Sequence, residues 1–249
     1  MNWTQKTLRK DIDCAGIGLH SGVRVAMRMR PAPPNTGIIF RRIDLDGVEI
    51  PARQEYLQRS NLATTLANGD ATIGTVEHVL AAAAGLGIDN LIVEVKGKEV
   101  PILDGSASPF IYLMHEAGIR VQKAPREFIK ILEPLRIEEE DKFLAVYPSD
   151  RFKISYTIDF EHPLIGEQQQ TFVVTPRSFT EQIAPARTFG FLSEVEALHR
   201  NGFALGGSME NAVVIGHNSI LNNQLRFEDE FVRHKILDAI GDIMLIGSP

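Results

Sequence analysis

An apolar helix close to the end of this 249-residue chain carries three ionisable residues on one stripe. His234, Asp238 and Asp242 follow one another at intervals of four residues, which places them on one face of a helix, one turn apart. The helix should run from about 228 to 246, and its other residues are mostly apolar: Ile236, Leu237, Ile240, Ile243 and Met244. Charged groups on a buried helix are costly unless they are paired or bound to a metal. The chain must therefore fold so that this stripe meets a partner.

A second polar pair opens another apolar helix. Glu77 and His78 stand at the beginning of an alanine-rich helix predicted for residues 75–85. With His234 and Asp238, His78 would give a catalytic zinc ion its usual three protein ligands and leave one position open. Glu77 would then lie beside the metal as a general base. Iron(II) suits the same ligands.

Simpler interpretations of these residues stay open. A histidine four residues before an aspartate is most often a surface pair. A glutamate at the start of a helix is favoured by the helix dipole, and the histidine after it can be an ordinary core residue. Lys235 is either a solvated helix charge or a cation for an anionic substrate group. Thr188, in the loop 187–190, offers a hydroxyl for an oxyanion, but a single threonine decides little.

Composition and charge are those of an ordinary globular protein. Of the residues, 44% are hydrophobic and 23% are charged, and the net charge is −6 with a pI near 5.7. Such an acidic chain has no general attraction for nucleic acid. The single cysteine, Cys14, allows no intrachain disulfide. No stretch approaches the ~18 apolar residues of a membrane span, and the N-terminus lacks the apolar core of a secretion signal. We expect a cytoplasmic protein without a membrane span, and a monomer because no apolar stripe stands exposed.

The first half of the chain reads as short strands followed by helices. The alternation of apolar and basic residues in 22–30 predicts a half-exposed strand, and 37–42 and 90–96 are two further strands. Thr75 should be the N-cap of the alanine-rich helix. Residues 108–117 predict a second helix, because a proline suits its first turn and a glycine follows its end.

The same order returns in the second half. Residues 122–127 are polar and contain a proline, so a domain boundary is expected there. The N-terminal domain, 1–124, would carry the Glu77-His78 pair, and the C-terminal domain, 125–249, would carry the second polar helix. Strands followed by helices in each half indicate an α+β fold of two similar domains. The elements expected in the second half are strands at 128–133, 135–140, 142–148 and 152–159 and helices at 178–183 and 228–246.

Two irregular insertions, at about 40–60 and 187–212, interrupt these elements. The second is rich in glycine and apolar residues, and loops of this kind either shape a ligand groove or are ordinary surface connections. Another glycine-rich segment, 16–22, contains His20 but lacks the strand–loop–helix context of a phosphate-binding loop. We expect that segment to be a structural turn or a wall of the site.

These segments together resemble one family, the bacterial zinc-dependent UDP-3-O-acyl-N-acetylglucosamine deacetylases, which catalyse the committed step of lipid A synthesis. The resemblance covers the whole chain in order, and its last segment is long and specific. The matching segments are 16–22, 30–37, 75–78, 85–90, 101–106, 186–191 and 225–242.

The resemblance implies a catalytic role for each polar candidate. His78, His234 and Asp238 would be the zinc ligands, and Glu77 would be the general base. Asp242 would orient a catalytic histidine. The implied fold has two α+β domains, each a β-sheet packed on a pair of helices, with the helices sandwiched between the sheets and the active site at the domain junction.

The resemblance also implies how the substrate, an acylated UDP-GlcNAc, is bound. Thr188 would support the oxyanion, and Phe189 and Lys235 would contact the sugar nucleotide. The second insertion would line a hydrophobic passage for the acyl chain. The expected wall residues of this passage are Phe191, Val195, Ala204 and Gly207.

The chain departs from the family pattern at one point. In the family, the segment after the Asp238 helix continues to a histidine that is the general acid, whereas here residues 243–249 follow and no residue matches it. His217 lies before the metal helix and does not replace it. General acid catalysis typically contributes ~10²–10⁴-fold. We therefore expect a C-terminally shortened member with weak or no turnover.

Three functions follow from these residues. The first is a zinc amidohydrolase that releases acetate from UDP-3-O-acyl-GlcNAc and loses its activity on Glu77→Ala. The second is a module that binds zinc and the acylated sugar nucleotide without hydrolysing it. The third is a sugar-nucleotide binder without metal, in which His234 and Asp238 form a plain ion pair whose mutation leaves ligand affinity nearly unchanged.

Overall fold

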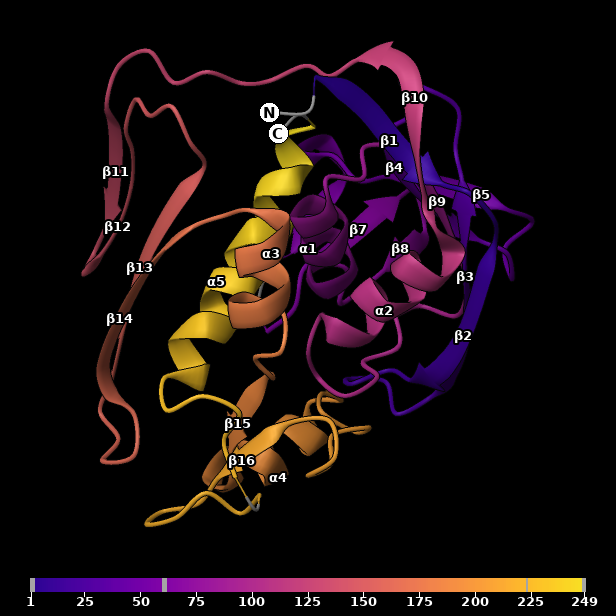
Figure 1. The fold of residues 1–249 in the computed structure, drawn as a ribbon. Coiled ribbons are helices and arrows are strands. Elements are labelled where there is room, and N and C mark those ends of the chain that lie inside the picture. The colour runs from indigo at the N-terminus through magenta and orange to yellow at the C-terminus, as the bar shows by residue number, and fades with distance from the viewer. Residues whose placement is uncertain (1–2, 60–61, 223, 248–249) are drawn as a thin grey trace.

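The computed structural model describes residues 3–59, 62–222 and 224–247. They form an α+β fold, as expected. The N-terminal half contains helices α1 (Glu77–Leu86) and α2 (Ser108–Ala117), and the C-terminal half contains helix α5 (Glu230–Ile243). Figure 1 shows these helices between the strands of the N-terminal half on one side and the hairpins of the C-terminal half on the other.

The largest sheet has five strands and lies in the N-terminal half. Its strands pair antiparallel except for β4 and β9, which are parallel. The alternation seen in the sequence explains its orientation: Val25, Met27 and Met29 on β3 are buried, and the residues that alternate with them, Arg24, Ala26 and Arg28, are exposed. The order of strands is β2 (Ile12–Ile17), β3 (Arg24–Pro31), β9 (Leu91–Lys96), β4 (Ile38–Arg42) and β5 (Val48–Pro51).

Smaller sheets surround the central layers. The paired strands are β1 (Thr4–Leu8) with β10 (Ile119–Pro125), β6 (Leu57–Arg59) with β7 (Thr65–Asn68) and β8 (Ala71–Ile73), β11 (Leu135–Glu139) with β12 (Lys142–Val146), β13 (Lys153–Phe160) with β14 (Gly166–Val173), and β15 (Phe189–Phe191) with β16 (Val213–Ile215). All of these pairs are antiparallel except β15 with β16. The short helices are η1 (Gln54–Tyr56), α3 (Pro176–Ser178), η2 (Phe179–Ile183), η3 (Leu192–Glu194), α4 (Val195–Arg200) and η4 (Met244–Ile246).

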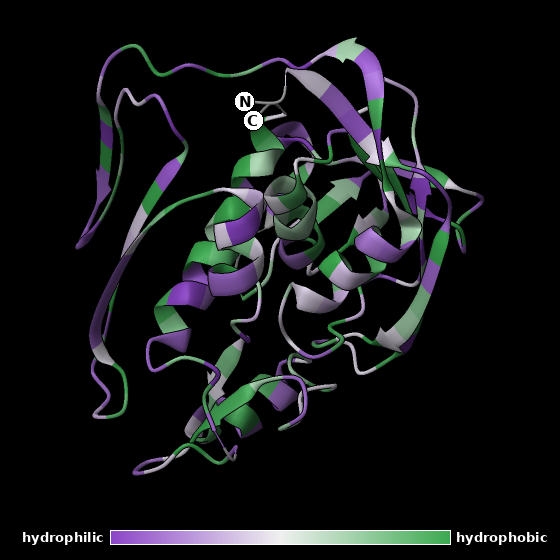
Figure 2. Cartoon of the chain, viewed as in Figure 1, coloured by the Kyte–Doolittle hydropathy of each residue, from purple (hydrophilic) through white to green (hydrophobic). Residues whose placement is uncertain are grey.

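The core joins both halves of the chain around α1. Every residue of α1 except Ala84 is buried, because α2, α5 and η2 pack around it. Phe110, Phe179 and Phe231 come from three different helices and are completely buried in one hydrophobic cluster. Figure 2 shows hydrophobic and hydrophilic residues alternating along α5, as expected of a helix with one buried face. In the described part of the chain, no helix has the length and apolar character needed to cross a membrane.

Most predicted elements are confirmed, and three predictions are wrong. The range 40–60, expected to be an irregular insertion, contains the end of β4 and then β5, η1 and β6. Residues 128–133 form no strand; they are mostly exposed and lead, without a partner strand, toward β11. Thr75 is not the N-cap of α1, because Val76 holds that position and the Thr75 hydroxyl donates instead to Oε1 of Glu99 at 2.8 Å. Thr75 has a φ of 57°, a left-handed conformation that is strained for a β-branched residue.

The expected domain boundary falls at a strand. β10 extends to Pro125 and pairs with β1, so the polar segment 122–127 is partly a strand of the N-terminal half. Residues 126–134 then form no helix or strand. The division into two similar domains at 124/125 stays a prediction.

Candidate metal centre

Helices α1 and α5 approach each other closely enough to bring the two predicted polar pairs together. Gly241 on α5 lies against the backbone of Glu77, the first residue of α1, and a Cβ at Gly241 would overlap the carbonyl oxygen of Glu77. A residue without a side chain is therefore required at this contact. The contact brings His78 next to the stripe of α5 that carries His234 and Asp238.

The three predicted metal ligands converge. Nε2 of His78 lies 3.7 Å from Oδ1 of Asp238, and Nε2 of His234 lies 3.4 Å from the same oxygen. The three ligand atoms lie within 4.8 Å of one another. Both histidines are buried, and the Asp238 side chain is 21% exposed. Two nitrogens and one oxygen at these separations can hold a divalent cation with a position left for another ligand.

One hydrogen bond beside the cluster directs a lone pair of His234 toward its centre. Nδ1 of His234 lies 3.1 Å from the carbonyl oxygen of Ala186. A carbonyl oxygen only accepts, so Nδ1 carries the proton and Nε2 presents its lone pair to the cluster. Oδ1 of Asp238 is buried and has no hydrogen-bond partner among the described residues. A cation would stabilise ligand atoms that face one another with no hydrogen-bond donor between them. These side chains therefore fit a zinc or iron(II) ion.

Burial and charge keep the three ligands in the protonation states that bind metals. Burial lowers the pKa of His78 to about 3 and also lowers the pKa of His234, so both imidazoles are neutral near pH 7. Burial works against ionisation of Asp238, but its neighbours His234 and Lys235 outweigh burial and lower its pKa to about 2. Nζ of Lys235 donates to Oδ2 of Asp238 at 3.1 Å, and this carboxylate raises the pKa of Lys235.

Two further carboxylates lie beside the cluster and share one partner, Thr64. The backbone N–H of Thr64 donates to Oε2 of Glu77 at 3.0 Å, and its hydroxyl donates to Oδ1 of Asp242 at 2.6 Å. Burial, and after it the charge of Asp238, raises the pKa of Glu77 well above its ordinary value, and burial raises the pKa of Asp242. A carboxylate with a raised pKa is suited to general base catalysis. Thr64 could not be predicted from the sequence, because it lies in a loop and its partners are 13 and 178 residues away.

A buried ion pair fixes the loop that reaches His234. Glu230 at the start of α5 is fully buried, and its Oε1 accepts from the backbone N–H of Arg187 at 2.9 Å and from Nε of Arg187 at 2.8 Å. The pair holds both neighbours of Arg187 in place, namely Ala186, whose carbonyl accepts the His234 proton, and Thr188. From the sequence, Thr188 and Phe189 of this loop were expected to act on the substrate, and the role of Arg187 was not predicted.

Strand β15 places some of the predicted substrate residues at the edge of the cluster. The ring of Phe189 lies 6.4 Å from the ring of His234 and 5.5 Å from Nζ of Lys235, and Thr188 precedes it directly. Phe191 lies at the other end of β15, where its ring contacts aromatic side chains of β13 and of the turn that follows it. Phe189 and Lys235 are thus close to the cluster, Thr188 is next to Phe189 in the chain, and the ring of Phe191 contacts Phe160 and His162 instead.

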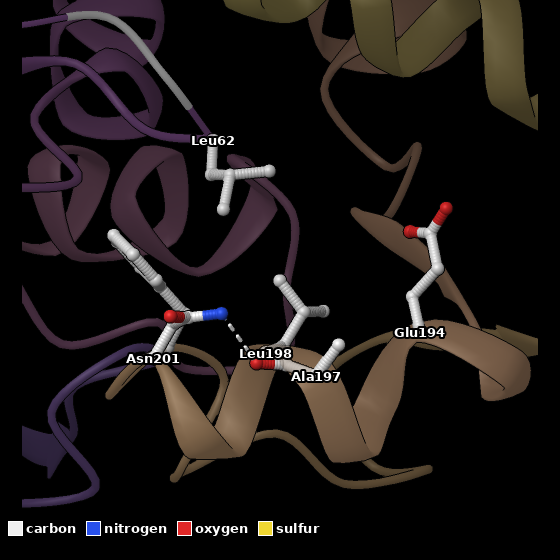
Figure 3. A pocket seen from close by; sticks show the side chains of 6 residues that line it. Leu62, Glu194, Ala197, Leu198 and Asn201 are labelled. Atoms are coloured by element: carbon white, nitrogen blue, oxygen red, sulfur yellow. Dashed lines mark hydrogen bonds between the residues drawn. The ribbon is translucent and has the colours of Figure 1, made fainter.

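A cavity of about 430 Å³, open to solvent, lies between the second insertion and the loop before β7 (Figure 3). Val195 and Ala204 are next in sequence to two of its lining residues, whereas Phe191 and Gly207 lie outside it. The assignment of the passage walls stays a prediction. Among the described residues, the lining consists of Leu62, Glu194, Ala197, Leu198, Asn201 and Phe203.

Comparison with known proteins identifies the family. The family model described as LpxC, UDP-3-O-acyl N-acetylglycosamine deacetylase, matches residues 5–249. A UDP-3-O-acyl-N-acetylglucosamine deacetylase of Pseudomonas entomophila (strain L48) is 50% identical over 248 residues, which are 98% of this chain and 82% of that protein. The enzyme of the same name from Coxiella burnetii (strain Dugway 5J108-111) is also 50% identical, over 247 residues and with the same coverage. The chain therefore belongs to the UDP-3-O-acyl N-acetylglycosamine deacetylase family.

Proposed function

We propose that this chain is a hydrolase that removes the acetyl group of a UDP-3-O-(3-hydroxyacyl)-N-acetylglucosamine, giving the free amine and acetate. The names of its relatives describe this deacetylation. The observation that carries the proposal is the convergence of two neutral histidines and one aspartate beside a buried glutamate of raised pKa. In the cell, this reaction would be the committed step of lipid A biosynthesis.

Three side chains would hold the metal. His78 and His234 would bind it through Nε2 and Asp238 through Oδ1, and either zinc or iron(II) suits this set. When bound, the ion supplies Lewis acidity, which polarises a carbonyl group and lowers the pKa of water. The carbonyl oxygen of Ala186 keeps His234 in the tautomer that binds metals.

Glu77 would take the proton from the attacking water. Its carboxylate is held by the backbone N–H of Thr64, and burial raises its pKa, so it can be ionised before the reaction and protonated after the attack. Asp242 is fixed by the hydroxyl of the same threonine and would orient a further proton carrier. Thr188, in the loop held by the Arg187–Glu230 pair, would donate to the developing oxyanion.

The substrate would lie along β15 and the second insertion. Phe189 and Lys235, which lie against each other at the edge of the cluster, would contact the sugar nucleotide. The second insertion would take the acyl chain. Its wall residues would be Phe191, Val195, Ala204 and Gly207, together with the apolar residues of the cavity in Figure 3.

The test compares acetate release by the zinc-loaded chain with release by Glu77→Gln, which keeps the shape of the side chain and removes the base. We expect acetate release by the first, even if slow, and a loss of at least about 100-fold in the second. Glu55→Gln, an exposed change in η1, is the matched control and should behave as the parent. Equal release by the parent and Glu77→Gln would refute the role of Glu77. Stoichiometric zinc and bound substrate without release would indicate a binding module instead.

A further inference from the structure

The glycine-rich turn between β2 and β3 docks onto the second insertion. The N–H of Gly206 donates to the carbonyl of Leu19 at 2.9 Å, and the N–H of Leu205 donates to the carbonyl of His20 at 3.2 Å. The N–H of Ala204 donates to Nδ1 of His20 at 3.3 Å. We call this contact between residues 18–22 and 203–206 the latch.

The latch depends on glycine at its closest points. A Cβ at Gly206 would overlap the carbonyl oxygen of Gly18 and would lie 3.2 Å from Cα of Gly22. Gly22 itself has a φ of 65°, and a Cβ there would lie 3.1–3.2 Å from Leu205. The two segments therefore approach closely at these glycines, so we expect a displacement of the turn to move the insertion with it.

One buried carboxylate fixes the turn. Glu99 is only 4% exposed, and its two oxygens accept from the backbone N–H groups of His20, at 2.9 Å, and Ser21, at 3.0 Å. Oε1 also accepts from the hydroxyl of Thr75, which lies two residues before the catalytic base. Among the described residues, the three groups that bind it are all donors, so a carboxylate satisfies them and an amide does not.

The latch continues into the cavity of Figure 3. Phe203 lines that cavity, and its ring meets the ring of His20 edge to face at 5.4 Å. Leu198 lines the same cavity from α4, and its carbonyl accepts from the N–H of Phe203. The position of one cavity wall is thus set by a turn in the N-terminal half, and that turn is set by Glu99.

We propose that Glu99 is a positioning residue that determines acyl-chain preference. Through the latch it fixes the cavity wall formed by Phe203, and this wall selects the length of the 3-O-acyl chain. The inference rests on the proposed function for the identity of the occupant. It requires no contact between Glu99 and the substrate.

The test measures equilibrium binding of UDP-GlcNAc and of UDP-3-O-acyl-GlcNAc with a short or a long acyl chain, by calorimetry. Each buried methylene contributes a factor of about four to affinity, so the loss of two or three methylene contacts weakens binding about 15- to 60-fold. For Glu99→Gln we expect this loss for the long chain and a change below about twofold for UDP-GlcNAc. Gly206→Ala alters the other side of the latch and should give the same pattern. Ser21→Ala is the control, because it keeps the backbone N–H that binds Glu99.

The results separate the latch from the proposed reaction. A loss confined to the long chain in either latch variant supports the role of Glu99. Three results would overturn this role of Glu99. They are equal losses of affinity for all three ligands, unchanged affinities in both folded variants, and a parent chain that shows no preference for acyl-chain length. If Glu99→Gln does not fold, the result for Gly206→Ala decides. Binding does not require turnover, so a parent that binds the long chain but releases no acetate would refute the deacetylation and leave the latch supported.

Discussion

Replacing Gly241 with alanine should disrupt the metal centre more than the fold. The new Cβ would lie 2.8 Å from the carbonyl carbon and 3.0 Å from Cα of Glu77, where ordinary contact begins at 3.4 Å, and it would overlap the carbonyl oxygen. All of these atoms are backbone, so α1 and α5 must separate, by an amount on the order of 1 Å. His78 lies on one of these helices, and His234 and Asp238 lie on the other.

The size of the effect follows from this separation. Overpacking in a core typically costs about 1–3 kcal/mol, which lowers the melting temperature of a chain of this size by roughly 2–12 °C. Displacement of a group by about 1 Å can cost on the order of 100-fold in activity, and we expect zinc affinity to fall about 10- to 100-fold. The assay is zinc competition with a chelator on the folded variant, together with thermal unfolding. Zinc affinity and stability both equal to those of the parent would refute the close approach of the two helices.

Three further results are expected. Thr64→Val should lower activity markedly, because it removes the hydroxyl that donates to Asp242, whereas Thr64→Ser keeps this hydroxyl and should retain most of the activity. Equal activities of the two variants would show that this hydrogen bond is unimportant. Arg187→Met leaves Glu230 buried with backbone N–H donors but without its charged partner and should cost about 3–5 kcal/mol of unfolding free energy in urea, whereas the exposed Arg177→Met should cost little. Burial lowers the pKa of His78 to about 3, so between pH 6.5 and 3 this residue binds more protons in the unfolded chain than in the folded one. The metal-free protein should therefore lose stability as pH falls through this range, by at most about 1.4 kcal/mol per pH unit for this group. A His78→Gln variant with an unchanged pH dependence would contradict that assignment.

Local spacing was sufficient to predict the elements that carry the site. The interval of four residues between His234 and Asp238 and the apolar residues around them predicted α5, because helix periodicity is a local property of the chain. The Glu77-His78 pair was placed correctly at the start of α1 for the same reason. Residues 128–133 have strand-like composition, but a strand also requires a partner, and composition does not report one.

Contacts between distant residues could not be predicted in this way. The N-cap expected at Thr75 failed because Glu99 takes its hydroxyl, and this partner lies on a different element. Thr64 escaped notice because its two hydrogen bonds depend on how α1 and α5 pack against the loop before β7. The close approach of α1 and α5 requires a glycine at position 241, and this requirement is visible only in the packed structure.

The central claim is that His78, His234 and Asp238 hold one metal ion. Its most direct test is the zinc content of the dialysed chain compared with that of His234→Gln, with circular dichroism to establish that both are folded. The account predicts one zinc ion per parent chain and a loss of tight binding in the variant, since the cluster would keep only two of its ligands. A folded variant that retains one tightly bound zinc ion, or a parent that binds none, would contradict it.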